Sequence, residues 1–468
     1  MVFSSILFLF YFLPVVLLAY FITPKKYRNL TLLFASLFFY SWGEPRYILI
    51  MLFSSVVDYT CGQKIYLNRQ KENNHQAKLW LLVSVFVNLG MLGFFKYSNF
   101  LLENLNNLLS ISLPLLNITL PIGISFYTFQ TMSYTIDVYR NETDVQNSLI
   151  SFATYVTLFP QLIAGPIVRY KTVADELDNR NESIDLFGEG VKRFIIGLGK
   201  KVLLANSIGL LWENIAVINL EVLPTLTAWL GVLAFTFQIY FDFSGYSDMA
   251  IGLGKMFGFN FLENFNYPYT SLSITDFWRR WHISLGSWFK EYVYIPLGGN
   301  RLSFSKNLRN ILIVWLLTGI WHGASWNFLV WGLYFGVILI IEKLFLAKYL
   351  ERLPIILRRV YTLTLVLISW VIFAFESLSY GLSYLKILFN PLLNGFLNTE
   401  ALYYLYTNII LFIILIIGSS EVPKKIWNKF NKNNKSMVFE NILLILCLVL
   451  TIANLVDQTY NPFLYFRF

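Results

Sequence analysis

The chain has 468 residues, of which 56% are hydrophobic and only 13% are charged. A soluble globular protein carries roughly a quarter charged residues, so this chain lacks the polar surface of a soluble body. Its formal net charge is +9, but the basic residues cluster in loops between apolar segments, which indicates membrane topology and no nucleic-acid partner. Two cysteines cannot form a disulfide scaffold or a metal cluster.

Long apolar segments predict an all-α polytopic membrane protein with roughly ten to twelve transmembrane helices. The first 22 residues lack a basic leading region and a clear cleavage site, so we expect a retained first span and no signal peptide. The candidate spans are 3–22, 30–42 with 47–61, 79–95, 119–137, 150–168, 190–215, 224–241, 308–320, 326–347, 357–375, 403–418 and 438–456. Several are shorter than the roughly 20 residues of a full crossing, and we expect these to be tilted, re-entrant or half-helices.

Glycine and proline interrupt several of these spans, at Pro121 and Gly123, at Pro160 with Gly165 and Pro166, and at Gly197 and Gly199. Broken backbone at membrane depth is tolerated where it is buried in protein or lines a wet cavity. The sequence therefore predicts a thick helical body with a cavity. We expect a single integral-membrane domain over 1–468, with core motifs at about 119–336 and peripheral spans at 1–95 and 357–456.

Four basic loops predict the orientation of the chain. They lie at residues 25–28, 64–78, 343–359 and 424–435, and the positive-inside rule places them in the cytoplasm and the N-terminus outside. Residues 171–190 form a charged stretch, expected to be a loop, followed by Lys192, Arg193, Lys200 and Lys201. These four basic residues suit either a helix end whose side chains reach water or the mouth of a site for a phosphate-bearing donor.

Residues 264–327 carry an unusual density of polar and aromatic groups for a membrane protein. Two of the chain's three histidines, His282 and His322, lie there, together with six tryptophans. Polar groups inside hydrocarbon are costly and mark functional sites. We therefore interpret this stretch as a reaction centre within the bilayer.

His322 lies in the segment GIWHGASWN, between Gly319 and Gly323. A single histidine on an apolar helix is often structural, but the two glycines allow a ligand or another backbone to approach closely. A neutral imidazole is the usual general base toward a hydroxyl group. The sequence thus favours His322 as a catalytic base.

His282 ends the run TDFWRRWH, which we expect to be helical with Trp278 and His282 on one face. The alternative is an interfacial helix, with tryptophan at the headgroups and Arg279 and Arg280 in water. If the two histidines meet in space, one would act as the base and the other would position the substrate. Further candidates to line the site are Asn266, Tyr267, Asp276, Trp278, Arg279, Arg280, Trp281 and Asn327.

A second polar cluster, QIYFDFSGYSDMAIG, places Gln238, Asp242 and Asp248 in an apolar surround. Carboxylates at this depth should face a cavity or pair with a basic residue. We expect a structural pair with the Arg279–Arg280 region, and we keep Gln238 and Asp242 as candidate lining residues. No metal is implied, because three scattered histidines make a poor site, and motifs of serine hydrolases and ATP-driven pumps are absent.

Six segments of the chain resemble the membrane-bound O-acyltransferase family. They are 120–140, 159–170, 238–259, 264–301 (which includes YPYTSLSITDFWRRWHISLGSWFKEYVYIPLGGNR), 319–336 (GIWHGASWNFLVWGLYFG) and 461–468 (NPFLYFRF). The resemblance is to the bacterial branch that includes alginate O-acetylases, peptidoglycan O-acetyltransferases and the teichoic acid D-alanyltransferase. YIPLGGNR and the terminal FRF are more similar to the alginate type.

This resemblance implies a ring of membrane helices around a central funnel from the cytosol, with His322 as the catalytic residue and His282 as the second polar residue of the active site. It implies an O-acyltransferase of the cytoplasmic membrane that uses acetyl-CoA as a donor, with no bound cofactor. The acceptor would be a cell-surface or secreted polysaccharide, reached with an exported acetyltransferase partner. The alternatives are a transporter or flippase for a polymer or lipid and a structural scaffold of a synthase complex.

Overall fold

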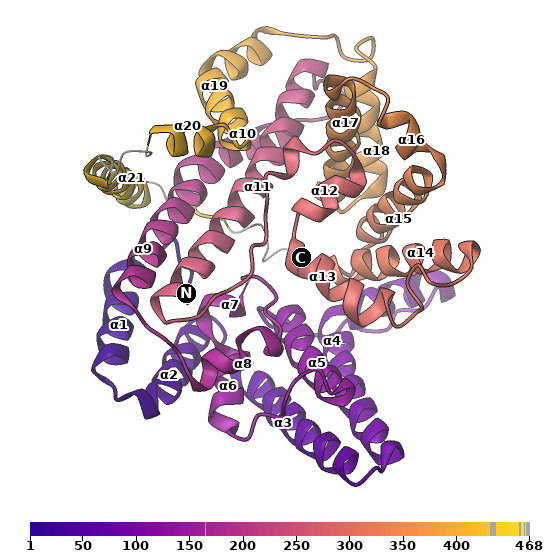
Figure 1. Ribbon diagram of the computed structural model, residues 1–468. Coiled ribbons are helices and arrows are strands. Elements are labelled where there is room, and N and C mark those ends of the chain that lie inside the picture. Colours follow the sequence, from indigo (N-terminus) through magenta and orange to yellow (C-terminus); the bar gives the residue numbers. More distant parts are fainter. Residues whose placement is uncertain (164, 431–436, 458–459, 463, 465–468) are drawn as a thin grey trace. The chain divides into compact units, whose positions relative to one another are not determined.

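The computed structural model describes residues 1–163, 165–430, 437–457, 460–462 and 464. Helices joined by loops make up this part of the chain, and no strand occurs in it (Figure 1), so the all-α prediction is confirmed. The chain divides into two compact units. Unit 1 comprises Met1–Phe194 and Tyr246–Leu262, and unit 2 comprises Ile195–Gly245 and Glu263–Phe468. The expectation of a single domain stays a prediction.

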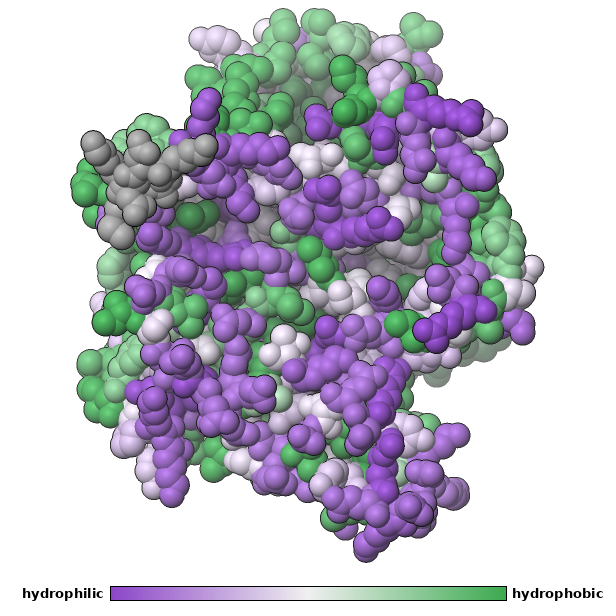
Figure 2. All heavy atoms as spheres, viewed as in Figure 1, coloured by the Kyte–Doolittle hydropathy of each residue, from purple (hydrophilic) through white to green (hydrophobic). Residues whose placement is uncertain are grey.

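Eight helical stretches of the described chain are long and apolar enough to cross a membrane, which confirms a multi-pass membrane protein. They are Ile48–Gln70, Asn74–Leu109, Ile184–Ala216, Thr225–Met256, Trp326–Leu350, Ile355–Ala374, Thr399–Gly418 and Val438–Asp457. The shorter apolar stretch Phe8–Ile22 belongs to the expected first span. Figure 2 shows apolar side chains at the surface of α1 and of α19, as lipid contact requires. The predicted total of ten to twelve crossings remains untested.

Besides the end of α11 (Thr225–Met256), from Tyr246 onward, unit 1 contains eight complete helices and the first part of a ninth. They are α1 (Leu13–Ile22), α2 (Arg28–Ser41), α3 (Ile48–Gln70), α4 (Asn74–Leu109), α5 (Ile124–Arg140), α6 (Leu149–Thr157), α7 (Phe159–Leu162), α8 (Tyr170–Asp178) and α9 (Ile184–Gly199). Helix α3 packs against both α4 and α5. A Cβ atom at Gly62 of α3 would lie 2.5 Å from the Tyr134 ring of α5, so glycine permits this close packing.

A buried polar network joins α3, α4 and α5 inside unit 1. The Asp58 carboxyl group accepts a hydrogen bond from Ser84 Oγ at 2.5 Å and two from Asn88 Nδ2 at 2.8 and 3.0 Å. Ser54 and Thr131 each donate to Asn88 Oδ1 at 3.1 Å. Neutral donors thus satisfy a carboxyl group that is fully buried among membrane helices.

Unit 2 contains the end of α9 and most of the remaining helices. They are α10 (Ser207–Ala216), α11 (Thr225–Met256, up to Gly245), α12 (Ile274–Arg280), α13 (Ile283–Phe289), α14 (Phe304–His322), α15 (Trp326–Ile341), α16 (Ala347–Leu350), α17 (Ile355–Ala374), α18 (Leu378–Phe389), α19 (Thr399–Gly418), α20 (Val422–Phe430) and α21 (Met437–Asp457). An aromatic core joins α11, α12, α15 and α17 through residues such as Tyr240, Trp281, Trp331 and Trp370. Helix α11 is the most buried of the eight candidate spans.

The predicted helix breaks take two forms. The span expected at 150–168 is interrupted between α6 and α7, just before Pro160, which confirms a broken helix there. The break expected at Gly197 and Gly199 is wrong, because Ile184–Ala216 continues as one helical stretch with a π-helical segment at Lys200–Asn206. The loop expected at 171–190 is also largely wrong, since α8 and the first part of α9 cover most of it.

Candidate active site

His282 lies at a break between two short helices, and this corrects the prediction of one helix through TDFWRRWH. Helix α12 ends at Arg280, and α13 begins at Ile283. His282 adopts the left-handed conformation, with φ 47° and ψ 53°, which is uncommon for a residue other than glycine. Trp278 and His282 therefore do not share a helix face. The break turns the imidazole into the interior, where His282 is 1% exposed.

Asn264 holds this break from the preceding segment of the chain. Its backbone carbonyl accepts the Ile283 N–H at 3.0 Å. Its side-chain oxygen accepts the N–H and the hydroxyl of Ser284 at 3.1 and 2.9 Å, and it lies 3.2 Å from His282 Nδ1. Sequence reasoning singled out Asn266 and missed Asn264. The signal available was a second asparagine in the same NFNYP segment.

Glu342 fixes the start of α12 from the end of α15. Its carboxylate accepts the backbone N–H groups of Ile274 and Thr275 at 2.7 and 2.9 Å and the Thr275 hydroxyl at 2.6 Å. The Ser273 side chain caps the same helix by accepting the Asp276 N–H at 3.0 Å. A seven-residue helix is unstable alone, so these contacts place the segment that ends at His282.

His322 is the last residue of α14 and is 6% exposed. Its ring makes edge contacts with Trp331 and Phe373, with ring centroids 4.9 and 5.5 Å apart. Helix α14 packs closely on α15 because a Cβ atom at Gly319 would collide with the backbone carbonyl of Phe328. The predicted close approach of another backbone at Gly319 is thereby confirmed.

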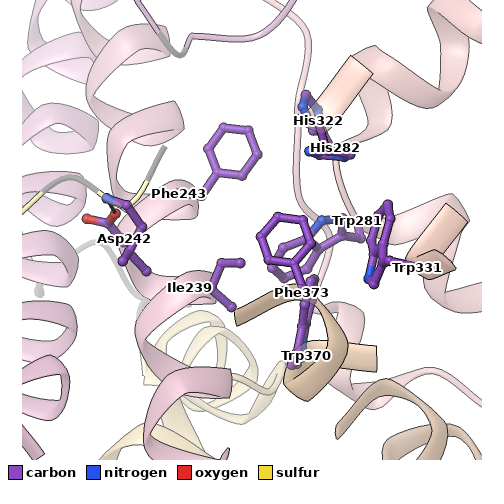
Figure 3. A pocket seen from close by; sticks show the side chains of 10 residues that line it. Ile239, Asp242, Phe243, Trp281, His282, His322, Trp331, Trp370 and Phe373 are labelled. Carbon is purple, nitrogen blue, oxygen red and sulfur yellow. Dashed lines mark hydrogen bonds between the residues drawn. The ribbon is translucent and has the colours of Figure 1, made fainter. Parts of the chain in front are cut away.

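The two histidines line one small chamber in unit 2 (Figure 3). Figure 3 shows His282 and His322 close together on one side, facing Phe243 and Ile239 of α11. The other lining residues are Asp242, Trp281, Trp331, Trp370, Phe373 and Leu464. The chamber measures about 20 Å³, which is room for one water-sized group. The sequence left open whether the two histidines meet, and the structure places them in one cavity.

A larger pocket of about 490 Å³ borders the chamber at His282, which lines both cavities. Pockets of roughly 300–1,000 Å³ suit small-molecule ligands. Trp278, Trp315 and Leu339 are among its apolar lining residues, and Arg279 and Lys290 are its basic ones. His282 therefore stands between a ligand-sized, partly basic pocket and the chamber that contains His322.

Asp242 pairs with Lys201, which corrects the predicted pairing with the Arg279–Arg280 region. Lys201 Nζ lies 2.8 Å from Asp242 Oδ1, and both side chains are at most 3% exposed. Asp248, in unit 1, pairs instead with Arg193 at 2.7 Å. Lys201 is thus neither a water-seeking helix end nor a basic mouth.

The same ion pair holds described residues near the C-terminus. Lys201 Nζ donates to Asn206 Oδ1 at 2.7 Å and to the backbone carbonyl of Pro462. The Leu464 N–H donates to Asp242 Oδ2 at 2.9 Å, and Leu464 lines the chamber. Of the predicted segment 461–468, residues 463 and 465–468 lie outside the described residues.

The remaining predicted residues divide into those that line a cavity and those that do not. Trp278 and Arg279 line the larger pocket, and Trp281 lines the chamber. Asp276 and Arg280 pair with each other at 2.9 Å. Asn327 is buried and donates to the carbonyls of Ile372 and Phe373. Gln238, Asn266 and Tyr267 line neither cavity, and Asn266 is exposed.

Burial controls the protonation of His282, which lies outside the eight candidate spans. Desolvation lowers the pKa of its imidazole from the ordinary value to about 3. His282 is therefore neutral near pH 7.

No group of three or more metal-ligating side chains occurs among the residues that the structure describes.

The chain is similar to known membrane-bound O-acyltransferases. The model of the membrane-bound O-acyltransferase family matches residues 46–385. A probable alginate O-acetylase of Pseudomonas aeruginosa is 47% identical over 81% of this chain and 73% of its own. One of Pseudomonas putida is 41% identical over the full length of both chains. A peptidoglycan O-acetyltransferase of Helicobacter pylori is 36% identical over 82% of this chain and 79% of its own.

Proposed function

The chain belongs to the membrane-bound O-acyltransferase family, and on this premise we propose that it moves an acetyl group from cytosolic acetyl-CoA toward a cell-surface or secreted polysaccharide. The observation that carries the proposal is the shared chamber of His282 and His322, which adjoins a ligand-sized pocket. The relatives named above are described as acting on alginate or on peptidoglycan. The acceptor of this chain is accordingly a glycan of the cell envelope or an exported polymer.

The larger pocket supports the donor side of this reaction. The basic loop at 343–359 is cytoplasmic by the positive-inside rule. Leu339, at the end of α15 next to that loop, lines the larger pocket. Phe373, at the opposite end of α17, lines the chamber. A donor held in the larger pocket would therefore reach His282 from the cytoplasmic side, with Arg279 and Lys290 available to its phosphates.

His322 acts as the general base in this proposal. The acceptor hydroxyl gives its proton to His322 while its oxygen attacks the thioester carbonyl. The new C–O ester bond forms, the C–S bond breaks, and the thiolate of coenzyme A takes the proton back from His322. A positioned base contributes typically about 10²–10⁴-fold, and holding both reactants in a dry chamber adds to this.

The attacking hydroxyl belongs either to the glycan or to an exported partner protein that completes the transfer outside. A tunnel through the cytoplasmic membrane suits both, because the nucleotide of the donor stays in the cytosol while only the acetyl group moves on. The coenzyme A leaving group is too polar to cross the bilayer with it.

Alkali-releasable acetate on the envelope and secreted polymer tests this function. We would compare wild type, a deletion strain, His322→Ala and the matched control His75→Ala, each protein at equal membrane level. His75 is exposed in unit 1 and far in sequence from the site. Loss of acetate in the deletion and His322→Ala strains alone is expected. Acetate retained in the His322→Ala strain would contradict the role of His322 as general base and favour a structural scaffold. Acetate unchanged in the deletion strain would favour a transporter.

A further inference from the structure

We propose that Asn264 is a positioning residue that fixes His282 as the tautomer with its hydrogen on Nδ1, which makes Nε2 a hydrogen-bond acceptor at the reaction chamber. The chemical use of that nitrogen rests on the acyl transfer proposed above. The tautomer itself does not, because it follows from hydrogen-bond donors and acceptors within unit 2.

The orientation of the Asn264 amide is settled by Ser284. A backbone N–H can only donate, and the Ser284 N–H points at the Asn264 side chain at 3.1 Å. The atom facing it must therefore be the oxygen, since a rotated amide would set its NH₂ group against that N–H. The Ser284 hydroxyl, 2.9 Å from the same oxygen, donates there as well.

The same oxygen then decides the state of the histidine. His282 Nδ1 lies 3.2 Å from Asn264 Oδ1. A carbonyl oxygen only accepts, so a hydrogen bond at this distance requires the hydrogen on Nδ1. In a neutral imidazole the other nitrogen, Nε2, then carries a lone pair. Burial of the ring favours this neutral form over the imidazolium.

The backbone prevents the ring from escaping this arrangement. His282 is held in the left-handed conformation, and the Asn264 backbone carbonyl binds the next residue, Ile283, at 3.0 Å. Phe243 meets the imidazole edge to face, with ring centroids 4.7 Å apart. His282 lines both cavities, and the acceptor nitrogen Nε2 lies across the ring from Asn264.

This tautomer gives the two histidines different tasks. His282 Nε2 accepts a hydrogen bond from a hydroxyl of the acceptor other than the attacking one, which orients the acceptor toward the thioester, and His282 exchanges no proton. His322 removes the proton. The mechanism of a catalytic triad shows how strongly such a choice matters, because a wrong histidine tautomer there lowers kcat by about 10⁴-fold.

Nitrogen-15 NMR of the purified full-length protein, with labelled histidine, tests the tautomer directly. Only three histidines are present, so His75→Gln and His282→Gln assign the signals. We expect His282 of the wild type to show a protonated Nδ1 and an unprotonated Nε2 near pH 7. A protonated Nε2 with a bare Nδ1, or a doubly protonated ring, would overturn the proposal whatever the activity of the protein.

Substitutions of Asn264 extend the test to function. Asn264→Ala removes the acceptor, so we expect a mixed tautomer and a fall of about 10- to 100-fold in acetyl transfer per folded molecule. Asn264→Asp keeps an acceptor, so the Nδ1–H tautomer and part of the activity should return. Ser284→Ala is the matched control for the tautomer, because it removes a different donor to the same oxygen.

A pH profile separates positioning from simple support of the fold. The charged or titratable groups that line the cavities with His282 are Asp242, His322, Arg279, Lys290 and Tyr294. Asn264→Asp adds a negative charge beside the imidazolium form and should move the acidic limb of the profile to higher pH. If Asn264→Ala and Asn264→Asp both leave the wild-type nitrogen signals and pH profile and merely lower the yield, Asn264 has only a structural role.

Discussion

Two buried polar regions of the molecule differ in what surrounds them. The Asp58 network of unit 1 joins α3, α4 and α5, and its carboxyl group is satisfied by Ser84 and Asn88. The histidine region of unit 2 lines a chamber and borders a pocket of about 490 Å³. Both would be costly to bury without partners. Of these two regions, the histidine region offers room for a reactant, and this is why we propose the reaction there.

The largest expected effect of a single change on stability concerns Lys201. Lys201→Met leaves the Asp242 carboxylate buried without its cation, and breaking one partner of such a pair costs about 3–5 kcal/mol. The melting temperature of the purified protein should fall sharply. Adding Asp242→Leu should recover most of the loss. If Lys201→Met alone were as stable as wild type, the ion pair between Lys201 and Asp242 would not be desolvated.

Asn88→Ala tests the other polar region, the Asp58 network of unit 1. It removes two hydrogen bonds to the buried Asp58 carboxyl group, and bonds to such groups contribute about 1.5–3 kcal/mol each. We expect a lower melting temperature with acetyl transfer per folded molecule close to that of wild type. A loss of transfer in fully folded protein would mean that the Asp58 network takes part in the reaction.

Glu342→Gln probes how the site depends on α12. A glutamine keeps one acceptor oxygen but turns an amide toward the N–H groups of Ile274 and Thr275, at a cost of about 1–2 kcal/mol. Because α12 ends two residues before His282, transfer should fall together with stability. Glu351→Gln, at an exposed residue directly after α16, is the control and should change neither transfer nor stability.

The smallest expected effect is the pH dependence contributed by His282. Its folded pKa is lowered to about 3, and an unfolded histidine titrates near 6.5. Between these values the unfolded chain binds more protons, so this contribution is complete above about pH 6.5 and is lost as the pH falls toward 3. The melting temperature of His282→Gln should therefore depend less on pH between 5 and 7. An equal dependence in both proteins would contradict a neutral, buried His282.

The fold class could be predicted from the sequence because its signals are local. The length of an apolar segment identifies a membrane span. The segments around His282 and His322 are part of a resemblance to one family that extends over most of the chain. His282, His322, Trp281 and Asp242 line one chamber, and their roles in catalysis and binding stay predictions.

The details that could not be predicted depend on partners far away in the chain. TDFWRRWH has no proline or glycine, so nothing local announces the break at His282. That break is stabilised by Asn264 and, through α12, by Glu342. Lys201, between α9 and α10, and Asp242, on α11, are 41 residues apart in the chain. The residues next to each of them give no indication that the two side chains pair. Arg280 was misassigned because Asp276, one turn earlier, offers a nearer carboxylate.

The most direct test of the central claim uses purified protein in sealed lipid vesicles with acetyl-labelled acetyl-CoA. Transfer of the label to a hydroxyl-bearing envelope glycan or to its exported partner, with release of coenzyme A, would be measured for wild type, His322→Ala and Asn88→Ala at equal folded amounts. The account predicts a loss of about 10²–10⁴-fold for His322→Ala alone. Equal transfer by His322→Ala and wild type would contradict a reaction site at the histidine chamber.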